Sequence, residues 1–540
     1  MQQAPWWRGA VIYQVYPRSL MDSNDDGIGD LPGIISKLDY IASLGVDAIW
    51  VSPFFKSPMK DFGYDISDYR AIDPIFGTLN DFDQLIKQAH ARNIKIIIDQ
   101  VLSHTSDQHA WFEESRESKT NPKADWYVWA DAKLDGTPPN NWLAIFGGSA
   151  WEWEPRRCQY YLHNFLKSQP DLNYHCPAVR KQMLEEVEFW LERGVDGVRL
   201  DAINFCFHDK ELRNNPVNPV EERKGRGFSP DNPYAYQRHI YDNTRPENLP
   251  FLEELRAVMD RYPGSVTLGE IGSEESLKTM AEYTAGNQRL HMAYSFELLV
   301  DNLSASYIRD TVETLEKNLG EGWPCWAFGN HDVPRVMSRW GGEQQSPDMA
   351  KMLNRLLLSL RGSVCSYQGE ELGLTEAVIQ QHELQDPYGI TFWPRFKGRD
   401  GCRTPMPWNS AEKNAGFSSA KTWLPVSPAH LPLAVEAQAN NKASILNSYR
   451  QFVIWRKNQP ALLLGDITFL AAPDNVLIFV RRHEQQAMLA AFNLTDKLIT
   501  VDLEKKLCAK AMQANGIDVA NIDAQKLNLA PYASVFAEIM

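Results

Sequence analysis

The sequence lacks the features that would place the protein in a membrane, on nucleic acid or in an oxidising compartment. No segment reaches the about 18 apolar residues that span a bilayer, and the N-terminus has no basic stretch followed by an apolar one. Net charge is −14 without a basic tract, which argues against nucleic acid or an anionic membrane as a partner. The seven cysteines contain no CxxC pair, so neither a disulfide framework nor a zinc site is indicated. We therefore expect a cytoplasmic protein with reduced thiols.

In other respects the composition is ordinary for a globular protein. Of the 540 residues, 44% are hydrophobic and 23% are charged. A chain of this length exceeds what one hydrophobic core usually organises. We expect one large domain accompanied by one or two smaller ones.

Short apolar runs recur along the chain, and helix-like segments such as 79–92, 178–193 and 248–262 lie between them. This alternation is typical of βαβ units and a parallel sheet. Eight such runs predict the α/β fold class, and within it a (β/α)8 barrel whose functional side chains follow the carboxyl ends of the strands. The runs are AVIYQVYP from Ala10, VDAIWVSP from Val46, IKIIIDQV from Ile94, GVRLDA from Gly197, VTLGE from Val266, MAYSFE from Met292, CWAFGN from Cys325 and SVCSYQG from Ser363.

Two parts of the chain depart from this alternation. The segment after the third strand is rich in Trp, Asn, Pro and Gly and predicts an inserted, loop-rich subdomain at 104–173. From 465 to 540, short alternating strands without helices predict a separate antiparallel β-sandwich domain. The barrel would then comprise 1–103 and 174–464, with a further long insertion at 373–418 after the last strand.

Charged side chains interrupt the strand-like run GVDGVRLDA that begins at Gly194. Arg199 and Asp201 lie two residues apart and therefore project from the same face of the strand. Buried charge persists when chemistry uses it or when it is fully paired, so this run alone fits a catalytic acid and a structural salt bridge equally well. Other predicted strands also end in polar residues, which favours the catalytic reading: Asp99, Glu270, His331 and Asp332.

Glycoside hydrolysis requires two carboxylates that flank the scissile bond, one ionised and one protonated. The fourth and fifth barrel strands are neighbours, so Asp201 and Glu270 can lie about 5 Å apart, the separation of a retaining enzyme. Asp201 would be the nucleophile and Glu270 the acid/base. We expect Arg199 to lower the pKa of Asp201, and repulsion from Asp201 and Asp332 to keep Glu270 protonated near neutral pH.

Seven separate motifs occur along the chain: GVDAIWVSP at 45, DQVLSH at 99, QPDLN at 169, GVDGVRLDA at 194, GE at 269, NHD at 330 and YQGEELG at 367. Together they resemble the α-amylase family of retaining α-glycoside hydrolases, and within it bacterial α-glucosidases and oligo-1,6-glucosidases. The resemblance covers nearly the whole chain and implies no organic cofactor.

The resemblance implies a role for each residue in these motifs. Asp201 would be the nucleophile, Glu270 the proton donor and Asp332 the residue that distorts the sugar and stabilises the transition state. A histidine beside a barrel strand is, taken alone, more often a packing residue. The remaining implied roles are binding of sugar hydroxyls by His104 and His331 and orientation of the nucleophile by Arg199.

Tyr64 and Asp65 in FGYDISDY match the family's wall around the terminal sugar. Asp65 would pair with an arginine of GRDGCRTPMPW, with Arg399 slightly preferred over Arg403. Such a pair would bind the 4-hydroxyl and close the pocket, which makes the enzyme exo-acting. The alternative is a surface ion pair that contributes under about 1 kcal/mol. Further candidates for the lining, for which core packing is an equally good explanation, are Phe146, Phe165 and Phe296.

Ala202, directly after the predicted nucleophile, bears on the linkage that is cleaved. In the resembling subgroup a valine here accompanies α-1,6 cleavage, and alanine or threonine accompanies α-1,4 cleavage. We therefore expect an exo-acting retaining α-glucosidase that acts on maltose-like glucosides and transfers glucose to alcohols as well as to water. The alternatives are an oligo-1,6-glucosidase, since QPDLN resembles the signature of that group, a sucrose-hydrolysing relative, or a non-catalytic amylase-fold scaffold. A monomer and a homodimer both remain open.

The sequence DSNDDGIGD from Asp22 matches the first nine positions of a calcium-binding loop. Gly33 replaces the glutamate expected at the twelfth position. We expect a structural Ca²⁺ or Mg²⁺ here, as in the resembling glucosidases, and an unoccupied Asx turn is the alternative. The oxygen ligands would come from Asp22, Asn24, Asp26, Asp30 and the carbonyl of Ile28.

Overall fold

Eight parallel strands form the central sheet of the protein, whose computed structural model describes residues 4–223, 228, 232–342, 345–503, 509–511, 521–523 and 526–539. The strands are β1 (Val11–Val15), β2 (Ala48–Val51), β5 (Lys95–Val101), β9 (Gly197–Asp201), β10 (Val266–Ile271), β11 (Met292–Ser295), β12 (Cys325–Trp326) and β13 (Ser363–Tyr367). Their order in the sheet is β11, β10, β9, β5, β2, β1, β13, β12, and a parallel bridge between Ala293 and Pro324 joins its two ends. The predicted (β/α)8 barrel is confirmed.

The barrel forms because its strands are apolar on both faces. Inward-facing residues such as Ile12, Trp50, Ile97, Leu268 and Met292 make one interior cluster. The outward-facing residues of the same strands belong to a larger cluster that the surrounding helices cover. Parallel strands buried on both sides read as continuous apolar runs, which is why all eight were recognisable in the sequence.

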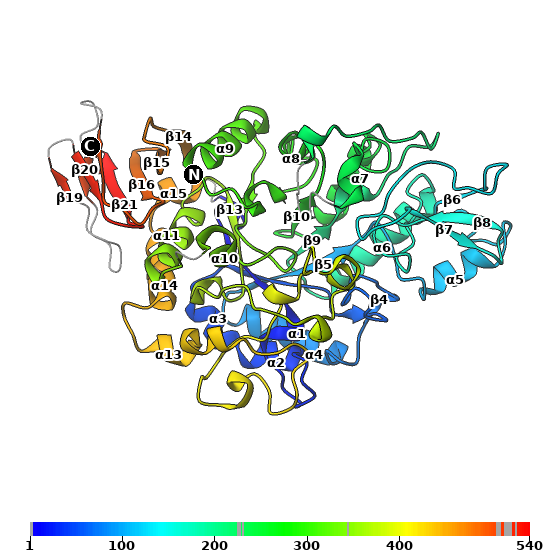
Figure 1. Cartoon of the computed structure of the whole chain (residues 1–540), viewed down its shortest axis with the longest axis horizontal. Coiled ribbons are helices and arrows are strands. Elements are labelled where there is room, and N and C mark those ends of the chain that lie inside the picture. The colour runs from blue at the N-terminus through cyan, green and yellow to red at the C-terminus, as the bar shows by residue number, and fades with distance from the viewer. Residues whose placement is uncertain are drawn as a thin grey trace.

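The helices cover the outside of the barrel (Figure 1). In one of them, residues 79–90, a capping box between Thr78 and Asp81 starts the helix, and a stripe of buried residues from Phe82 to Ala89 faces the sheet. The α-helices are α1 (Pro17–Leu20), α2 (Leu31–Ser36), α3 (Leu38–Ser43), α4 (Leu79–His90), α5 (Ala110–Glu117), α6 (Pro177–Glu192), α7 (Asn248–Met259), α8 (Ser276–Tyr283), α9 (Ala305–Leu319), α10 (Val336–Gly341), α11 (Pro347–Leu357), α12 (Pro387–Phe392), α13 (Val435–Ala439), α14 (Ile445–Arg456) and α15 (Pro460–Leu464). No helix among the described residues is long and apolar enough to cross a membrane.

Two long segments interrupt the barrel near the carboxyl ends of its strands. Between β5 and α6, α5 accompanies a small antiparallel sheet of β6 (Trp129–Ala130), β7 (Trp151–Glu154) and β8 (Gln159–Leu162), which lies at the right in Figure 1. Between β9 and α7, the chain forms the short 3-10 helices η1 (Ile203–Phe205), η2 (Val220–Glu222) and η3 (Pro233–Tyr236). The sequence did not predict this insertion at 202–247, which is called the second insertion below. A two-stranded ribbon of β3 (Phe55–Lys56) and β4 (Asp68–Ile72) follows β2.

Two antiparallel sheets lie toward the C-terminus, at the left in Figure 1. Arg481 in this region is buried and donates to the carbonyl oxygens of Ser359 and Gly465, at 2.6 and 2.8 Å, which ties the sheets to the barrel. The first sheet contains β14 (Asp466–Phe469), β15 (Val476–His483), β16 (Gln486–Asn493), β21 (Ser534–Ile539) and β18 (Ala509–Ala511), and the second contains β17 (Ile499–Asp502), β20 (Lys526–Leu529) and β19 (Asn521–Asp523).

The cysteines of the described residues are free thiols. Cys325 and Cys365 face each other across β12 and β13, with their Sγ atoms 3.5 Å apart. The seventh cysteine, Cys508, lies outside the described residues.

Candidate active site

A cavity of about 500 Å³ opens at the carboxyl ends of the barrel strands. Asp201 is the last residue of β9 and Glu270 the fifth of the six residues of β10, so the barrel itself delivers both carboxylates to this cavity. Asp332 follows β12 and also lines the cavity. The three predicted catalytic acids are therefore brought together, at the end of the barrel where such enzymes place their chemistry.

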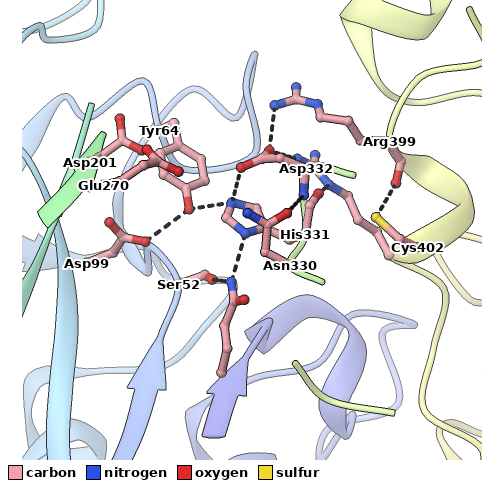
Figure 2. Close-up of polar contacts among 12 residues, drawn as sticks. Ser52, Tyr64, Asp99, Asp201, Glu270, Asn330, His331, Asp332, Arg399 and Cys402 are labelled. Atoms are coloured by element: carbon pink, nitrogen blue, oxygen red, sulfur yellow. Dashed lines mark hydrogen bonds and ion pairs between the residues drawn. The ribbon is translucent and has the colours of Figure 1, made fainter. Parts of the chain in front are cut away.

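One guanidinium group, that of Arg199, links Asp201 and Glu270 to Asp99; Figure 2 shows these three acids. Nη1 of Arg199 donates to Oδ1 of Asp99 at 2.7 Å and to Oδ1 of Asp201 at 2.8 Å. Its Nη2 lies 2.5 Å from Oε1 of Glu270 and donates to the hydroxyl of Tyr294 at 2.9 Å. Arg199 is fully buried. Arg199 thus forms structural ion pairs and at the same time belongs to the acidic site. The two explanations for the charges on this strand, a catalytic acid and a structural salt bridge, therefore do not exclude each other.

The expected low pKa of Asp201 is wrong for this structure. Burial raises the pKa of Asp201 to about 7, although Arg199 opposes this shift. The reason is that burial outweighs the attraction of Arg199, and repulsion from Asp99 and Asp332 adds to the upward shift. Burial, and then repulsion from Asp201 and Asp332, raises the pKa of Glu270 to about 7, in the expected direction. Near neutral pH the nucleophile candidate and the acid candidate compete for a proton.

Asp332 lies against two arginines and a histidine, and the arginines favour its ionised form. Its Oδ1 accepts from Arg399 at 3.2 Å and from Arg403 at 3.0 Å, and His331 lies 3.3 Å from its Oδ2. Burial acts to raise the pKa of Asp332, but its neighbours, among which Arg399 and Arg403 are permanently charged, outweigh it and hold the pKa well below the usual range. A permanent negative charge therefore faces the cavity next to the other two acids.

His331 is part of a hydrogen-bonded chain behind the cavity wall (Figure 2). Its Nδ1 lies 2.7 Å from Nε2 of Gln14, and its Nε2 lies 2.6 Å from the hydroxyl of Tyr64, which donates to Oδ2 of Asp99 at 3.0 Å. Burial lowers the pKa of His331 far below its ordinary value, so the ring is neutral. His331 and Arg199 are fully buried, and the cavity is lined in front of them by Tyr64 and the three acids.

The expected ion pair between Asp65 and Arg399 is not formed. Arg399 instead donates to Oδ1 of Asp61 at 2.8 Å, and Asp61 lines the cavity. Asp65 is fully buried and accepts from the backbone N–H groups of Lys60 and Asp61, at 2.9 and 3.0 Å. Its carboxylate closes the loop in which it lies, and this turn directs Asp61 and Tyr64 toward the cavity. Arg399 does line the cavity, but it pairs with Asp61 and not with Asp65.

Arg399 is anchored from behind by a second acid. Asp386 is fully buried, caps α12, and accepts from Nη2 and the backbone N–H of Arg399, at 2.8 and 2.7 Å. The same carboxylate accepts from the backbone N–H of Tyr388 at 3.1 Å, and Tyr388 lines the cavity. The segment that follows the last barrel strand therefore supplies one wall of the site.

The remaining predicted lining residues are where the sequence placed them. The cavity is lined by His104, Phe146, Phe165, Phe296 and Ala202. The sequence reasoning missed the contribution of the second insertion, because its residues follow no strand and match none of the quoted motifs. From this insertion the lining includes Phe205, Asn218, Glu221, Glu222, Phe228, Tyr234, Ala235, Gln237, His239 and Asn243.

The loop from Asp22 to Asp30 is stabilised by its own side chains. Asp22 accepts from the N–H groups of Asn24 and Gly27, at 3.0 and 2.8 Å, and Asp26 accepts from that of Ile28 at 2.8 Å. Oxygen donors of this kind suit a hard cation such as Ca²⁺ or Mg²⁺. Within the ranges that the structure describes, however, no three acidic, His or Cys side chains are grouped as metal ligands. The oxygen donors of this loop suit such a cation chemically, but the carboxylates of Asp22 and Asp26 accept hydrogen bonds from the loop backbone.

Comparison with known proteins places these features in context. The α-amylase catalytic domain family matches residues 14–465. A probable α-glucosidase of Rhizobium meliloti (strain 1021) is 54% identical over 99% of this chain and 97% of its own, and an oligo-1,6-glucosidase of Heyndrickxia coagulans is 38% identical over 92% and 93%. The crystal structure of the α-glucosyl transfer enzyme XgtA matches with a TM-score of 0.98 and 61% identity over the full length of both chains. An isomaltulose synthase of Erwinia rhapontici NX5 matches with a TM-score of 0.89 and 34% identity, over 99% of each chain.

Proposed function

Because this chain belongs to the α-amylase family and is a glycoside hydrolase of the α-glucosidase and oligo-1,6-glucosidase type, we propose that it releases glucose from the non-reducing end of short α-1,4-linked glucosides. The observation that carries this proposal is the arrangement of Asp201 and Glu270 on one guanidinium in a cavity that the Asp61–Arg399 pair helps to line. In this proposal that pair binds the terminal sugar and blocks longer chains, which makes the action exo.

The proposed reaction is a double displacement. Asp201 attacks the anomeric carbon while Glu270 gives its proton to the leaving glycosidic oxygen. The resulting glucosyl ester on Asp201 is then attacked by water, whose proton returns to Glu270, and glucose leaves with its α configuration retained. Asp332, ionised next to the sugar, stabilises the positive charge that develops on the ring in both steps.

An alcohol can replace water in the second step, which gives transglucosylation. The aromatic lining supports this part of the proposal, because Phe146, Phe165, Phe205, Phe296 and Tyr234 offer an apolar surface to the aglycone or acceptor. The structural relative XgtA is described as an α-glucosyl transfer enzyme.

The linkage preference depends on Ala202. Its backbone is left-handed, with φ 41°, and its N–H donates to Oε2 of Glu270 at 3.1 Å. A β-branched residue would be strained in this conformation, so alanine is accommodated here at less cost than valine, and alanine is one of the two residues that we associate with α-1,4 cleavage. An oligo-1,6-glucosidase is the second candidate, because relatives of that name are 34–38% identical to this chain.

We predict that maltose is hydrolysed at least about tenfold faster than isomaltose or sucrose at equal, subsaturating concentration, a difference typical of pocket-based selectivity. Released glucose is measured enzymatically, and the anomer that forms first is identified by NMR; we expect α-glucose. The matched variant Ala202→Val should reduce this preference for maltose.

Any other result of these measurements would contradict a specific part of the proposal. Isomaltose or sucrose ahead of maltose would contradict the linkage assignment and leave the acids in their roles. β-Glucose as the first product would contradict double displacement. No turnover of any of the three sugars would favour the non-catalytic alternative.

We also propose that the loop of Asp22 and Asp26 binds one divalent cation, supported by oxygen donors at the first, third, fifth and ninth positions of a calcium-loop pattern. Since a cation that binds only the folded state stabilises it, Ca²⁺ or Mg²⁺ at about 100 times its Kd should raise the unfolding free energy by about 2.7 kcal/mol relative to EDTA. Thermal unfolding measures this difference. Asp26→Ala should abolish it, while Asp25→Ala, at an exposed neighbour outside the donor set, should retain it. Equal melting temperatures with cation and EDTA would show that the loop is an unoccupied Asx turn.

A further inference from the structure

Tyr294 is a tyrosine in an otherwise largely apolar barrel interior. It lies on β11 directly opposite Glu270 of β10, because the parallel register pairs these two residues. Its side chain is only 1% exposed and packs in the interior cluster with Trp50. A phenol hydroxyl at such a place needs polar partners, and the register leaves it next to the acid/base candidate.

The hydroxyl of Tyr294 connects Arg199 with Glu270. It accepts from Nη2 of Arg199 at 2.9 Å and donates to Oε1 of Glu270 at 3.0 Å. The same Oε1 lies 2.5 Å from Nη2 of Arg199. The other carboxylate oxygen, Oε2, accepts from the backbone N–H of Ala202. Glu270 is therefore held at both oxygens, and two side-chain donors meet at Oε1.

We propose that Tyr294 is a positioning residue that, with Arg199, directs the transferable proton of Glu270 to Oε2. The inference rests on the proposed role of Glu270 as acid/base. An arginine nitrogen cannot accept a hydrogen bond, so Oε1 must act as an acceptor toward Arg199. Because the Tyr294 hydroxyl already accepts from Arg199, its own proton points to Oε1 as well. Oε2 is left as the oxygen that carries the proton in the acid form.

The hydroxyl of Tyr294 also affects the pKa of Glu270. The charged groups that face Glu270 are Arg199 and Asp201 from β9 and Asp332 after β12, with Asp99 of β5 behind the guanidinium. Among them the Tyr294 hydroxyl is a neutral donor that stabilises the ionised carboxylate. Without it, the ionised form loses one donor and the proton is held more tightly.

Tyr294→Phe tests this inference because it removes only the hydroxyl. The acid form of Glu270 is the active one, so a raised pKa moves the basic limb of the kcat/KM profile to higher pH, by about one unit for a lost hydrogen bond to a charged group. A misplaced proton should lower kcat for maltose about tenfold, a part of the about 10²- to 10⁴-fold that general acid catalysis contributes. A nitrophenyl glucoside, whose leaving group needs little protonation, should be affected much less.

Tyr13→Phe is the matched control. Tyr13 is a fully buried tyrosine on β1 whose hydroxyl donates to Oε1 of Glu371 at 2.8 Å, and neither residue lines the cavity. This variant loses the same kind of hydrogen bond, so it should match Tyr294→Phe in any loss of melting temperature while keeping the wild-type pH profile.

A second substitution acts in the opposite direction and keeps the test valid if the phenylalanine variant does not fold. A fluorotyrosine at position 294 retains the ring and makes the hydroxyl a stronger donor, so the basic limb should move to lower pH. The inference is overturned if neither substitution moves the basic limb, or if Tyr294→Phe slows maltose and the nitrophenyl glucoside equally. Absence of turnover by the wild-type protein overturns the proposed function itself.

Discussion

Asp201→Asn is expected to reduce kcat on maltose by about 10⁴-fold or more, because loss of a nucleophile removes the covalent pathway and leaves only binding and electrostatic stabilisation. The side chain keeps its shape and its contact with Arg199 through the amide oxygen, so melting temperature should change little. Initial-rate measurements on maltose and on a nitrophenyl glucoside give the loss directly. Both substrates should be affected, since the nucleophile is needed whatever the leaving group.

Trapping of the intermediate identifies the nucleophile independently of the rates. A fluorinated glucosyl fluoride, whose ester is hydrolysed slowly, should add one fluoroglucosyl group to the wild-type protein, and peptide mass spectrometry should locate it on Asp201. The Asp201→Asn protein should remain unlabelled. A label on another residue, or retention of most of the activity by the variant, would remove Asp201 from its proposed role.

Glu270→Gln should lower kcat on maltose by about 10²- to 10⁴-fold, the usual contribution of a general acid and base. The loss should be smaller for the first step with a nitrophenyl glucoside, because a nitrophenolate leaves without protonation. Added azide, which needs no general base, should restore turnover of that substrate and give the α-glucosyl azide. This retained product distinguishes the acid/base from the nucleophile, whose replacement would yield the β product.

The pH dependence of activity provides a second test of the role of Glu270. Burial and the neighbouring aspartates raise the pKa of Glu270 to about 7, and its protonated form is the active one. Activity should therefore fall as pH rises through about 7, and this limb should be absent in Glu270→Gln. Glu371→Gln is the matched control, since Glu371 is also a buried glutamate bonded to a tyrosine hydroxyl but lies outside the cavity. A basic limb that persists in Glu270→Gln would assign it to another group.

The barrel and the position of its acids were predictable because both follow local rules. Strands buried on both faces leave continuous apolar runs in the sequence, and all eight were found. Asp201 and Glu270 could be assigned to one site because parallel strands in a barrel present their carboxyl ends on the same side. The alternation of side chains along a strand likewise placed Arg199 and Asp201 on one face.

The error at Asp65 shows where local rules end. Asp61 and Asp65 are both aspartates of one short loop, and the sequence does not say which of them faces inward. In the structure, two backbone N–H groups occupy Asp65, and Asp61 meets an arginine 338 positions away. Such a choice depends on loop geometry and on a distant partner, neither of which has a sequence period.

The sequence by itself determined the fold class, the acids at the strand ends and the chemistry that two such carboxylates can perform. Only the tertiary structure decided that one buried arginine serves Asp99, Asp201 and Glu270 together, and that burial raises the pKa of Asp201 against expectation. It also brought the second insertion onto the cavity and set Tyr294 beside the acid/base. The physical reason is that burial, the sharing of charge and long-range packing are properties of the assembled surroundings, whereas strand periodicity is a property of neighbouring residues.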